Sequence, residues 1–259
     1  MIIEKVYEAA LPGLQGKRVK EIRIGLSLLA VELDDGSIGV TYVLRKEIDE
    51  VCEAIQSNEK LEGASAVEIG KWALQGNNVI QKAVGLAVLN CVADFEKLEQ
   101  EKDSNNLDAV FSAEIKPSDT VGVVGHIGPV ISKLYGKVKR LIIFERGQSE
   151  SSSVYPESAQ PELLPECQVV FVTSATLING TLDGLLSHCT NAREVIMVGS
   201  STPMYPQAFS GTKVTALAGT RWLHSNRDMI FAGISHCSGM KQLIKNGQKV
   251  TVRIKPCSP

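Results

Sequence analysis

The sequence predicts two α/β units: an N-terminal α+β domain with an antiparallel meander and helices, then a Rossmann-like domain with a parallel sheet. Asp34-Asp35-Gly36 separates two runs in which apolar and polar residues alternate, which is typical of a hairpin. After residue 103 the pattern changes to short, fully apolar runs between helical segments, which is typical of strands buried on both faces of a parallel sheet. We expect the domains to cover 1–103 and 104–259.

The composition is that of a globular protein with a core and balanced charge. Of the 259 residues 44% are hydrophobic and 22% charged, and the net charge is −2. Because no clustered basic stripe is present, we expect no nucleic-acid partner. No apolar run approaches the roughly 20 residues that span a bilayer, and the N-terminus lacks the layout of a signal peptide. We therefore expect a cytoplasmic protein with no membrane partner, whose six cysteines, without a CxxC pair, are buried thiols.

In the N-terminal half, apolar residues at helical spacing predict a first helix that starts at Ile2 and ends at Pro12-Gly13. Alternating residues then predict the strands of the meander. Two helices follow. A short one is expected over 65–74, with Ser65 and Glu68 at the spacing of a capping box, and a long one over 77–98 with one apolar stripe.

The C-terminal half alternates predicted strands with helical segments. The apolar runs that predict its strands are 120–124, 140–144, 169–173, 194–198 and 213–217. The carboxyl ends of parallel strands lie at one edge of the sheet, and ligands of open α/β sheets bind beyond that edge. Residues that directly follow these strands are therefore the first candidates for a site.

The first such segment is the glycine loop Gly122-Val123-Val124-Gly125-His126-Ile127-Gly128. A glycine-rich turn from strand to helix leaves backbone N–H groups free for an anion. The spacing is GxxGxxG, which differs from the GxGxxG of dinucleotide binders. A turn that only lets strand and helix pack closely is equally compatible with it. Gly125, His126 and Gly128 are candidates for ligand contacts.

Glu145 ends the second strand, twenty positions after Gly125. In dinucleotide-binding folds an acidic residue at this place holds ribose hydroxyls. A solvated carboxylate beside Arg146 is the structural alternative.

Hydroxyl and amide side chains gather after the third and fourth strands. The first of these loops carries Thr173, Thr176, Asn179 and Thr181, and the second carries Gly199, Ser200, Ser201 and Thr202. Thr181 and Thr202 also suit helix N-caps. Because capping alone does not require so many hydroxyls in two adjacent loops, we favour a polar ligand site here.

Two further features were weighed for a site. Asn90 interrupts the apolar stripe of the long helix, and it either projects across a domain cleft or is satisfied by a neighbouring loop. The adjacent pairs His188-Cys189 and His236-Cys237 form no chelate by spacing, because neighbouring side chains point in different directions. A metal ion stays a candidate cofactor without assigned ligands.

Several segments of the chain resemble an uncharacterised family labelled as a heavy-metal chelation domain. The segments that carry the resemblance are 85–90, 123–129, 144–145, 173–181 and 199–203. The resemblance implies an N-terminal domain similar to that of enolase, a Rossmann-like domain and a site in the cleft between them. It also implies a set of site residues: Asn90, Gly125, Glu145, Thr176, Asn179, Thr181, Ser201 and Thr202. At His126-Ile127 the sequence differs from the more apolar pair expected there.

Three functions are compatible with these features. The first is a protein that binds or handles a small anionic or metal-linked ligand in the interdomain cleft, with a role in heavy-metal chelation. The second is an enzyme that uses a ribose-containing cofactor, S-adenosylmethionine or a dinucleotide. The third is a non-catalytic oligomeric scaffold. No motif identifies a reaction or a catalytic residue, so whether the chain is an enzyme, and whether it is a homo-oligomer, stays open.

Overall fold

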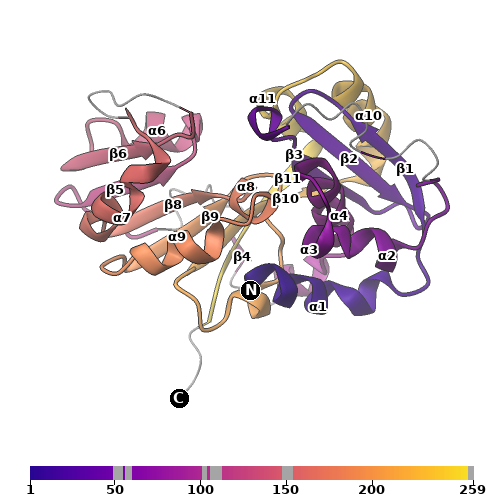
Figure 1. Cartoon of the computed structure of the whole chain (residues 1–259), viewed down its shortest axis with the longest axis horizontal. Helices are drawn as coiled ribbons and strands as arrows, with labels where there is room; N and C mark the ends of the chain where they lie inside the picture. Colours follow the sequence, from indigo (N-terminus) through magenta and orange to yellow (C-terminus); the bar gives the residue numbers. More distant parts are fainter. Residues whose placement is uncertain (49–54, 56–59, 101–103, 106–112, 148–153, 256–259) are drawn as a thin grey trace.

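Two β-sheets organise the molecule (Figure 1). The structure is a computed structural model that describes residues 1–48, 55, 60–100, 104–105, 113–147 and 154–255. A three-stranded antiparallel sheet lies in the N-terminal part, and the C-terminal part forms most of an eight-stranded, largely parallel sheet. The predicted fold class, mixed α/β with an antiparallel meander before a Rossmann-like sheet, is confirmed.

The N-terminal unit packs helices on one face of its small sheet. Its elements are α1 (Ile2–Leu14), β1 (Val19–Ile24), β2 (Leu28–Leu33), β3 (Ile38–Tyr42), α2 (Ala66–Gly70), α3 (Trp72–Gln75), α4 (Val79–Cys91) and α5 (Phe95–Gln100). Helix α4 lies on β2 and β3. The approach is so close that a Cβ atom on Gly39 would come 1.9 Å from the carbonyl oxygen of Ala87. Glycine is therefore required where this helix crosses the sheet.

Three local predictions in this unit are wrong. Helix α1 continues through Pro12 to Leu14, because burial of Leu14 stabilises its last turn. Ser65 makes no capping bond with its side chain, and its backbone pairs with Arg18 instead. The long helix stops at Cys91, since the side chain of Asp94 accepts a hydrogen bond from the backbone N–H of Lys97 (3.0 Å) and so starts a separate helix.

The large sheet has the strand order of a dinucleotide-binding fold. Its strands are β4 (Ser104–Asn105), β5 (Thr120–Val124), β6 (Arg140–Phe144), β7 (Val154–Tyr155), β8 (Val169–Thr173), β9 (Glu194–Val198), β10 (Ala216–Trp222) and β11 (Gly247–Arg253). Their order is β4-β11-β10-β9-β8-β5-β6-β7. From β7 to β10 this is the order 3-2-1-4-5-6 of Rossmann folds, with two antiparallel strands added beside β10.

Four predicted strands of the large sheet fall where expected, and one is displaced. β10 begins at Ala216 and reaches Trp222, although the apolar run had placed it at 213–217. The reason is β11, which pairs with β10 along its whole length and which the sequence pattern did not reveal. Short helices connect these strands: α6 (Gly128–Leu134), α7 (Gln160–Leu163), α8 (Ala175–Ile178) and α9 (Leu182–His188).

A C-terminal segment returns to the N-terminal sheet. Residues 224–246, which we call the C-terminal strap, contain α10 (Arg227–Ser235) and α11 (Met240–Leu243). Figure 1 shows this yellow segment beside β1 and β2. Buried side chains form a core between the strap, the end of β10 and the sheet: Leu28, Ala30, Ile38, Val40, Trp222, Ile230, Phe231, Ile234 and Leu243. The domain division at residue 103 stays a prediction. The strap, which follows that boundary in the sequence, packs on the first unit.

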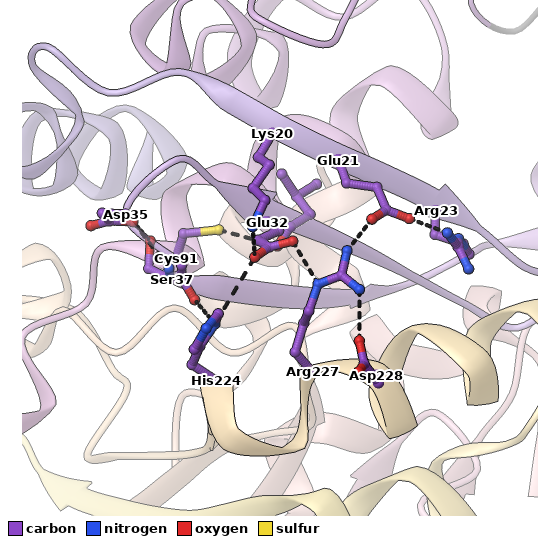
Figure 2. Close-up of polar contacts among 12 residues, drawn as sticks. Lys20, Glu21, Arg23, Glu32, Asp35, Ser37, Cys91, His224, Arg227 and Asp228 are labelled. Atoms are coloured by element: carbon purple, nitrogen blue, oxygen red, sulfur yellow. Dashed lines mark hydrogen bonds and ion pairs between the residues drawn. The ribbon is translucent and has the colours of Figure 1, made fainter.

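Ion pairs join the strap to the small sheet (Figure 2). The carboxylate of Glu32 is fully buried and is paired with Lys20 (2.9 Å) and with Arg227 of the strap (2.9 Å). Arg227 also contacts Glu21. Burial opposes the ionisation of Glu32, but hydrogen bonds from Lys20 and Arg227 outweigh it and lower the pKa of the carboxyl group. The charge of Glu32 is thus held by residues from both parts of the chain.

Candidate functional site

The carboxyl edge of the large sheet has a crevice-forming topology between β5 and β8. The chain leaves β5 toward β6 and later returns to β8 on the other side, so the loops that follow these strands diverge. Gly125 and Thr173 face each other at this point. A Cβ atom on Gly125, whose φ is +86°, would come 2.8 Å from Cγ2 of Thr173. Open α/β sheets bind ligands at such a position, and we call the position bordered by the loops after β5, β8 and β9 the switch-point crevice.

The amides of the glycine loop are already bonded within the protein. The N–H of His126 donates to Oε2 of Glu145 (2.8 Å). The N–H groups of Gly125, Ile127 and Gly128 donate to backbone carbonyls at 2.8–3.1 Å. Pro129 has no backbone N–H group. The loop therefore does not present the free amides that a phosphate needs. Glu145 and His126 are held against each other beside the crevice.

The loop after β8 divides into bonded and unbonded side chains. Thr176 donates to the carbonyl of Thr173 (2.8 Å), and Thr181 donates to the side-chain oxygen of Asn179 (2.8 Å). Asn179 in turn donates to Glu47 of the N-terminal unit (3.1 Å). Thr181 precedes α9 but makes no capping bond with its side chain. This loop is thus fastened to itself and to the first unit.

The loop after β9 lies against the N-terminal unit. Oγ of Ser201 accepts a hydrogen bond from the backbone N–H of Tyr42 (2.9 Å), and Nδ2 of Asn90 donates to the carbonyl of Ser201 (3.2 Å). Asn90 therefore does contact a loop of the second half. Thr202 begins no helix, so its expected role as a cap is wrong; its N–H instead closes a turn onto Gly199.

Buried polar atoms without hydrogen-bond partners gather in this region. Across the residues that the structure describes, five such side-chain atoms occur: Asn90 Oδ1, Ser174 Oγ, Ser200 Oγ, Thr202 Oγ1 and Trp222 Nε1. The first four belong to the loops after β8 and β9 and to the Asn90 side chain that contacts them. An unpaired buried polar group costs about 1–3 kcal/mol, and native proteins contain few of them. Buried polar atoms without protein partners are candidates for contacts with a ligand or with ordered water.

Charged residues from both units surround the crevice. Glu47 follows β3 and pairs with Arg146 (2.6 Å), which also pairs with Glu157 (2.6 Å). The pKa of the Arg146 guanidinium is raised, because the hydrogen bonds that it donates to Glu157 and the charge of Glu47 outweigh the desolvation that opposes them. Two carboxylates, those of Glu47 and Glu157, thus pair with one guanidinium here.

Tyr42 and Glu47 are site residues that the sequence reasoning missed. The ring of Tyr42 lies near Gly199, where Cε2 would be 3.8 Å from an added Cβ, and burial raises the pKa of its phenol. Nothing in the sequence marks the end of a meander strand as a neighbour of the second domain. The signal lies in the packing of the two units.

The described residues do not assemble a soft-metal site. Among them no group of three or more His, Cys, Asp and Glu residues is placed to hold an ion. Cys91, Cys167 and Cys189 are buried, as expected, whereas Cys237 is exposed; Cys52 and Cys257 lie outside the described residues. Burial raises the pKa of Cys167 to about 12 and that of Cys189 to about 11, so both are neutral thiols at pH 7. The helices of the same residues include none with the length and apolar character of a membrane span.

Family models cover most of the chain. The DUF364 model, described as "Putative heavy-metal chelation", matches residues 108–253, and the DUF4213 model, with the same description, matches residues 7–93. An uncharacterised protein of Methanocaldococcus jannaschii is 27% identical over 157 residues. That alignment spans 60% of this chain and 60% of the length of that curated relative.

Two solved structures share the fold over the whole chain. A protein of unknown function from the DUF364 family of Pyrococcus horikoshii has a TM-score of 0.83 at 21% identity, covering 98% of this chain and 100% of that one. Another, from Desulfitobacterium hafniense, has a TM-score of 0.77 at 24% identity, covering 97% and 98%. At these identities the likeness concerns the fold.

Proposed function

The chain belongs to the DUF364 family, and we propose that it binds a small, oxygen-rich ligand, alone or linked to a metal ion, in the switch-point crevice. The observation that carries the proposal is the cluster of unpaired buried atoms at Asn90, Ser174, Ser200 and Thr202. Three of these are hydroxyl groups, which can donate to ligand oxygens, and Asn90 Oδ1 requires a donor such as a hydroxyl group or a metal-bound water. The loops beside the crevice contact the N-terminal unit through Tyr42, Asn90 and Glu47, and small-molecule sites commonly lie where two units meet.

The charges around the crevice favour a metal-linked ligand over a free anion. Glu47 and Glu157 both pair with Arg146, and Glu145 adds a carboxylate beside the glycine loop, so a bare anion is repelled by the nearby carboxylates. Hydroxyl, amide and carboxylate oxygens suit a hard cation, whereas a thiophilic metal prefers thiolates. The donor set of the described residues thus does not fit a soft heavy metal held by the protein alone. The description of the family fits this chain best if the metal ion is coordinated by the small ligand and is bound together with it.

The proposal is tested by comparing ligand binding with stability. Thermal unfolding would be followed with citrate, Mg²⁺, Mn²⁺, Cd²⁺ and citrate–metal mixtures, each at about 1 mM, because a ligand that binds only the folded state raises its Tm. The double variant Ser200→Ala, Thr202→Val should unfold like the wild type but lose the ligand-induced increase. The matched control is Ser187→Ala, whose exposed hydroxyl donates to Gly184 on α9. Equal increases in the double variant and the wild type would refute the proposal.

A ribose-containing cofactor is the second candidate, because the strand order and the position of Glu145 after β6 match dinucleotide-binding folds. The bonded amides of the glycine loop count against its phosphate-bearing forms. S-adenosylmethionine and NAD would be titrated by calorimetry against wild type and Glu145→Gln. Binding that requires Glu145 would favour this candidate, and the absence of heat at about millimolar concentration would remove it.

A further inference from the structure

A second interdomain cavity lies beyond the carboxyl end of β10. It has a volume of about 370 Å³ and is lined by the hairpin turn 35–38, by residues at the end of α4 and the start of α5, and by residues 221–224. Figure 2 shows Asp35, Ser37, Cys91 and His224 converging at this place. It contains none of the residues that border the switch-point crevice.

One wall of the cavity carries hydrogen-bond donors. Arg221 lies over the ring of Phe95, 5.9 Å from its centroid, and pairs with Glu99 at 3.3 Å. Its side chain is 29% exposed, so part of the guanidinium stays within reach of a ligand. Trp222 also lines the cavity and is 7% exposed, and its indole N–H is among the buried polar groups without a partner. Arg221 thus brings a positive charge to the cavity, and Trp222 beside it has a buried N–H without a partner.

A second wall, which adjoins the first where Glu96 approaches Arg221, carries carboxylates. Asp94 uses Oδ1 to cap α5, which leaves its second oxygen for other contacts. Glu96 is mostly exposed and lies 3.8 Å from Arg221. Burial of Asp35 opposes its ionisation, but hydrogen bonds from Lys17 and Ser37 lower its pKa to about 2, so it is charged at neutral pH. Three carboxylates therefore come from the hairpin and from α5.

The remaining lining is apolar. Ile38, Ala93, Phe95 and Leu223 lie among the polar residues of the cavity. The edge beside the strap is formed by His224, whose Nδ1 donates to the carbonyl of Gly36 (3.0 Å). A ligand therefore meets positive and negative groups close together, and the same cavity offers apolar side chains.

We infer that this cavity binds a zwitterionic amino acid. Its carboxylate is placed at Arg221 and the indole N–H of Trp222, and its ammonium group at Asp94 and Glu96. A simple anion is repelled by the carboxylates and a simple cation by Arg221, whereas a zwitterion matches both walls. The aromatic rings also attract an ammonium group, and the apolar lining accepts an aliphatic side chain.

The test separates the two charges of the ligand. The twenty common amino acids are screened by thermal unfolding, and any that raises Tm is titrated by calorimetry beside its methyl ester and its N-acetyl derivative. The free amino acid should bind about tenfold or more tightly than either derivative, because each derivative lacks one charge. If no amino acid binds at about millimolar concentration, or if either derivative binds as well, the inference is wrong.

Variants locate the site. Arg221→Met should weaken the free amino acid about tenfold and leave the affinity for its methyl ester unchanged, since the ester has no carboxylate for Arg221. Asp94→Asn keeps a good N-cap for α5 and should remove the preference over the N-acetyl derivative. If either variant fails to fold, Trp222→Phe, which keeps an aromatic ring and removes the donor together with the five-membered ring, takes its place and should weaken binding of the free amino acid. The crevice variant Ser200→Ala, Thr202→Val should bind it normally. Binding that survives in the cavity variants or disappears in the crevice variant would overturn the assignment.

Discussion

At the scale of single residues, neighbouring side chains of the loop after β9 differ in hydrogen bonding: one has a partner and the residues beside it have none. Ser201 bonds Tyr42 across the unit boundary, while Ser200 and Thr202 on either side of it are buried and unpaired. Removal of one partner from a buried hydrogen bond destabilises a protein, whereas removal of a group that has no partner relieves a desolvation penalty. Variants of these three residues therefore distinguish a side chain that bonds across the two units from side chains that are available to a ligand.

We expect Ser201→Ala to lower the free energy of unfolding by about 1–2 kcal/mol, because the N–H of Tyr42 loses its acceptor. Ser200→Ala should leave it unchanged or raise it by up to about 1 kcal/mol. Urea unfolding followed by far-ultraviolet circular dichroism measures both. Equal losses in the two variants would show that Ser200 is paired in solution.

The hairpin turn makes a second residue-level prediction, which concerns pH. Because the pKa of Asp35 is lowered to about 2 in the folded protein, against about 3.9 in an unfolded chain, its contribution to stability is present above pH 4 and is lost as the pH falls toward 2. Asp35→Asn should therefore be less stable than wild type at neutral pH, and the difference should disappear near pH 2. Urea unfolding at several pH values measures it. A difference that does not change between pH 6 and 2 would contradict the prediction.

At the scale of secondary-structure elements, the crossing of α4 over β3 determines where Asn90 and Leu89 meet the second half of the chain. Leu89 accepts a hydrogen bond from the hydroxyl of Tyr205 (2.5 Å), and Asn90 bonds Ser201. Both contacts depend on how closely the helix approaches the sheet. Gly39 permits that approach.

Gly39→Ala should destabilise the protein by about 3 kcal/mol, because its methyl group would overlap the carbonyl of Ala87 and push α4 away from the sheet. The control is Gly184→Ala on α9, where an added Cβ meets no atom within 4 Å; alanine there should be neutral or stabilising by up to about 1 kcal/mol. Thermal unfolding compares the two. A Gly39→Ala variant as stable as its control would show that the helix can shift without loss.

The elements that the sequence predicted are those whose pattern is local. Apart from one polar residue at an end of each, β5, β6, β8 and β9 are apolar and largely buried, and this pattern identified them. β11 mixes polar and apolar residues at the side of the sheet, so no local pattern marked it. The loops after β8 and β9 were predicted for the same reason as their strands. Tyr42 and Glu47 could not be predicted, because only long-range packing brings them to those loops.

At the scale of the whole molecule, the C-terminal strap and the N-terminal sheet form one folding unit from the two ends of the sequence. Their shared core is apolar, but its edge is closed by the buried carboxylate of Glu32 and its partners Lys20 and Arg227. Removal of one partner from a buried ion pair leaves a charge with too little compensation. The strap is thus attached both by burial of its apolar side chains and by the ion pair between Arg227 and the buried carboxylate of Glu32.

Arg227→Met should lower the free energy of unfolding by about 3 kcal/mol, and the double variant Glu32→Met, Arg227→Met should recover a large part of that loss, since no buried charge then remains unpaired. Asp228→Asn is the control, because this partner of Arg227 is 92% exposed and should change stability by less than about 0.5 kcal/mol. If Arg227→Met matches its control, the strap is held by its apolar residues alone.

The late position of the strap has a consequence for synthesis on the ribosome. Leu28, Ala30, Ile38 and Val40 are made well before the side chains that cover them, which come from residues beyond 221. Until the strap has emerged, this apolar face of a nascent sheet lacks that cover, and exposed apolar surface leads growing chains to aggregate or recruit chaperones. We expect chains truncated before residue 224 to accumulate in the insoluble fraction of expressing cells. A separately expressed 1–103 segment should also be found in the insoluble fraction.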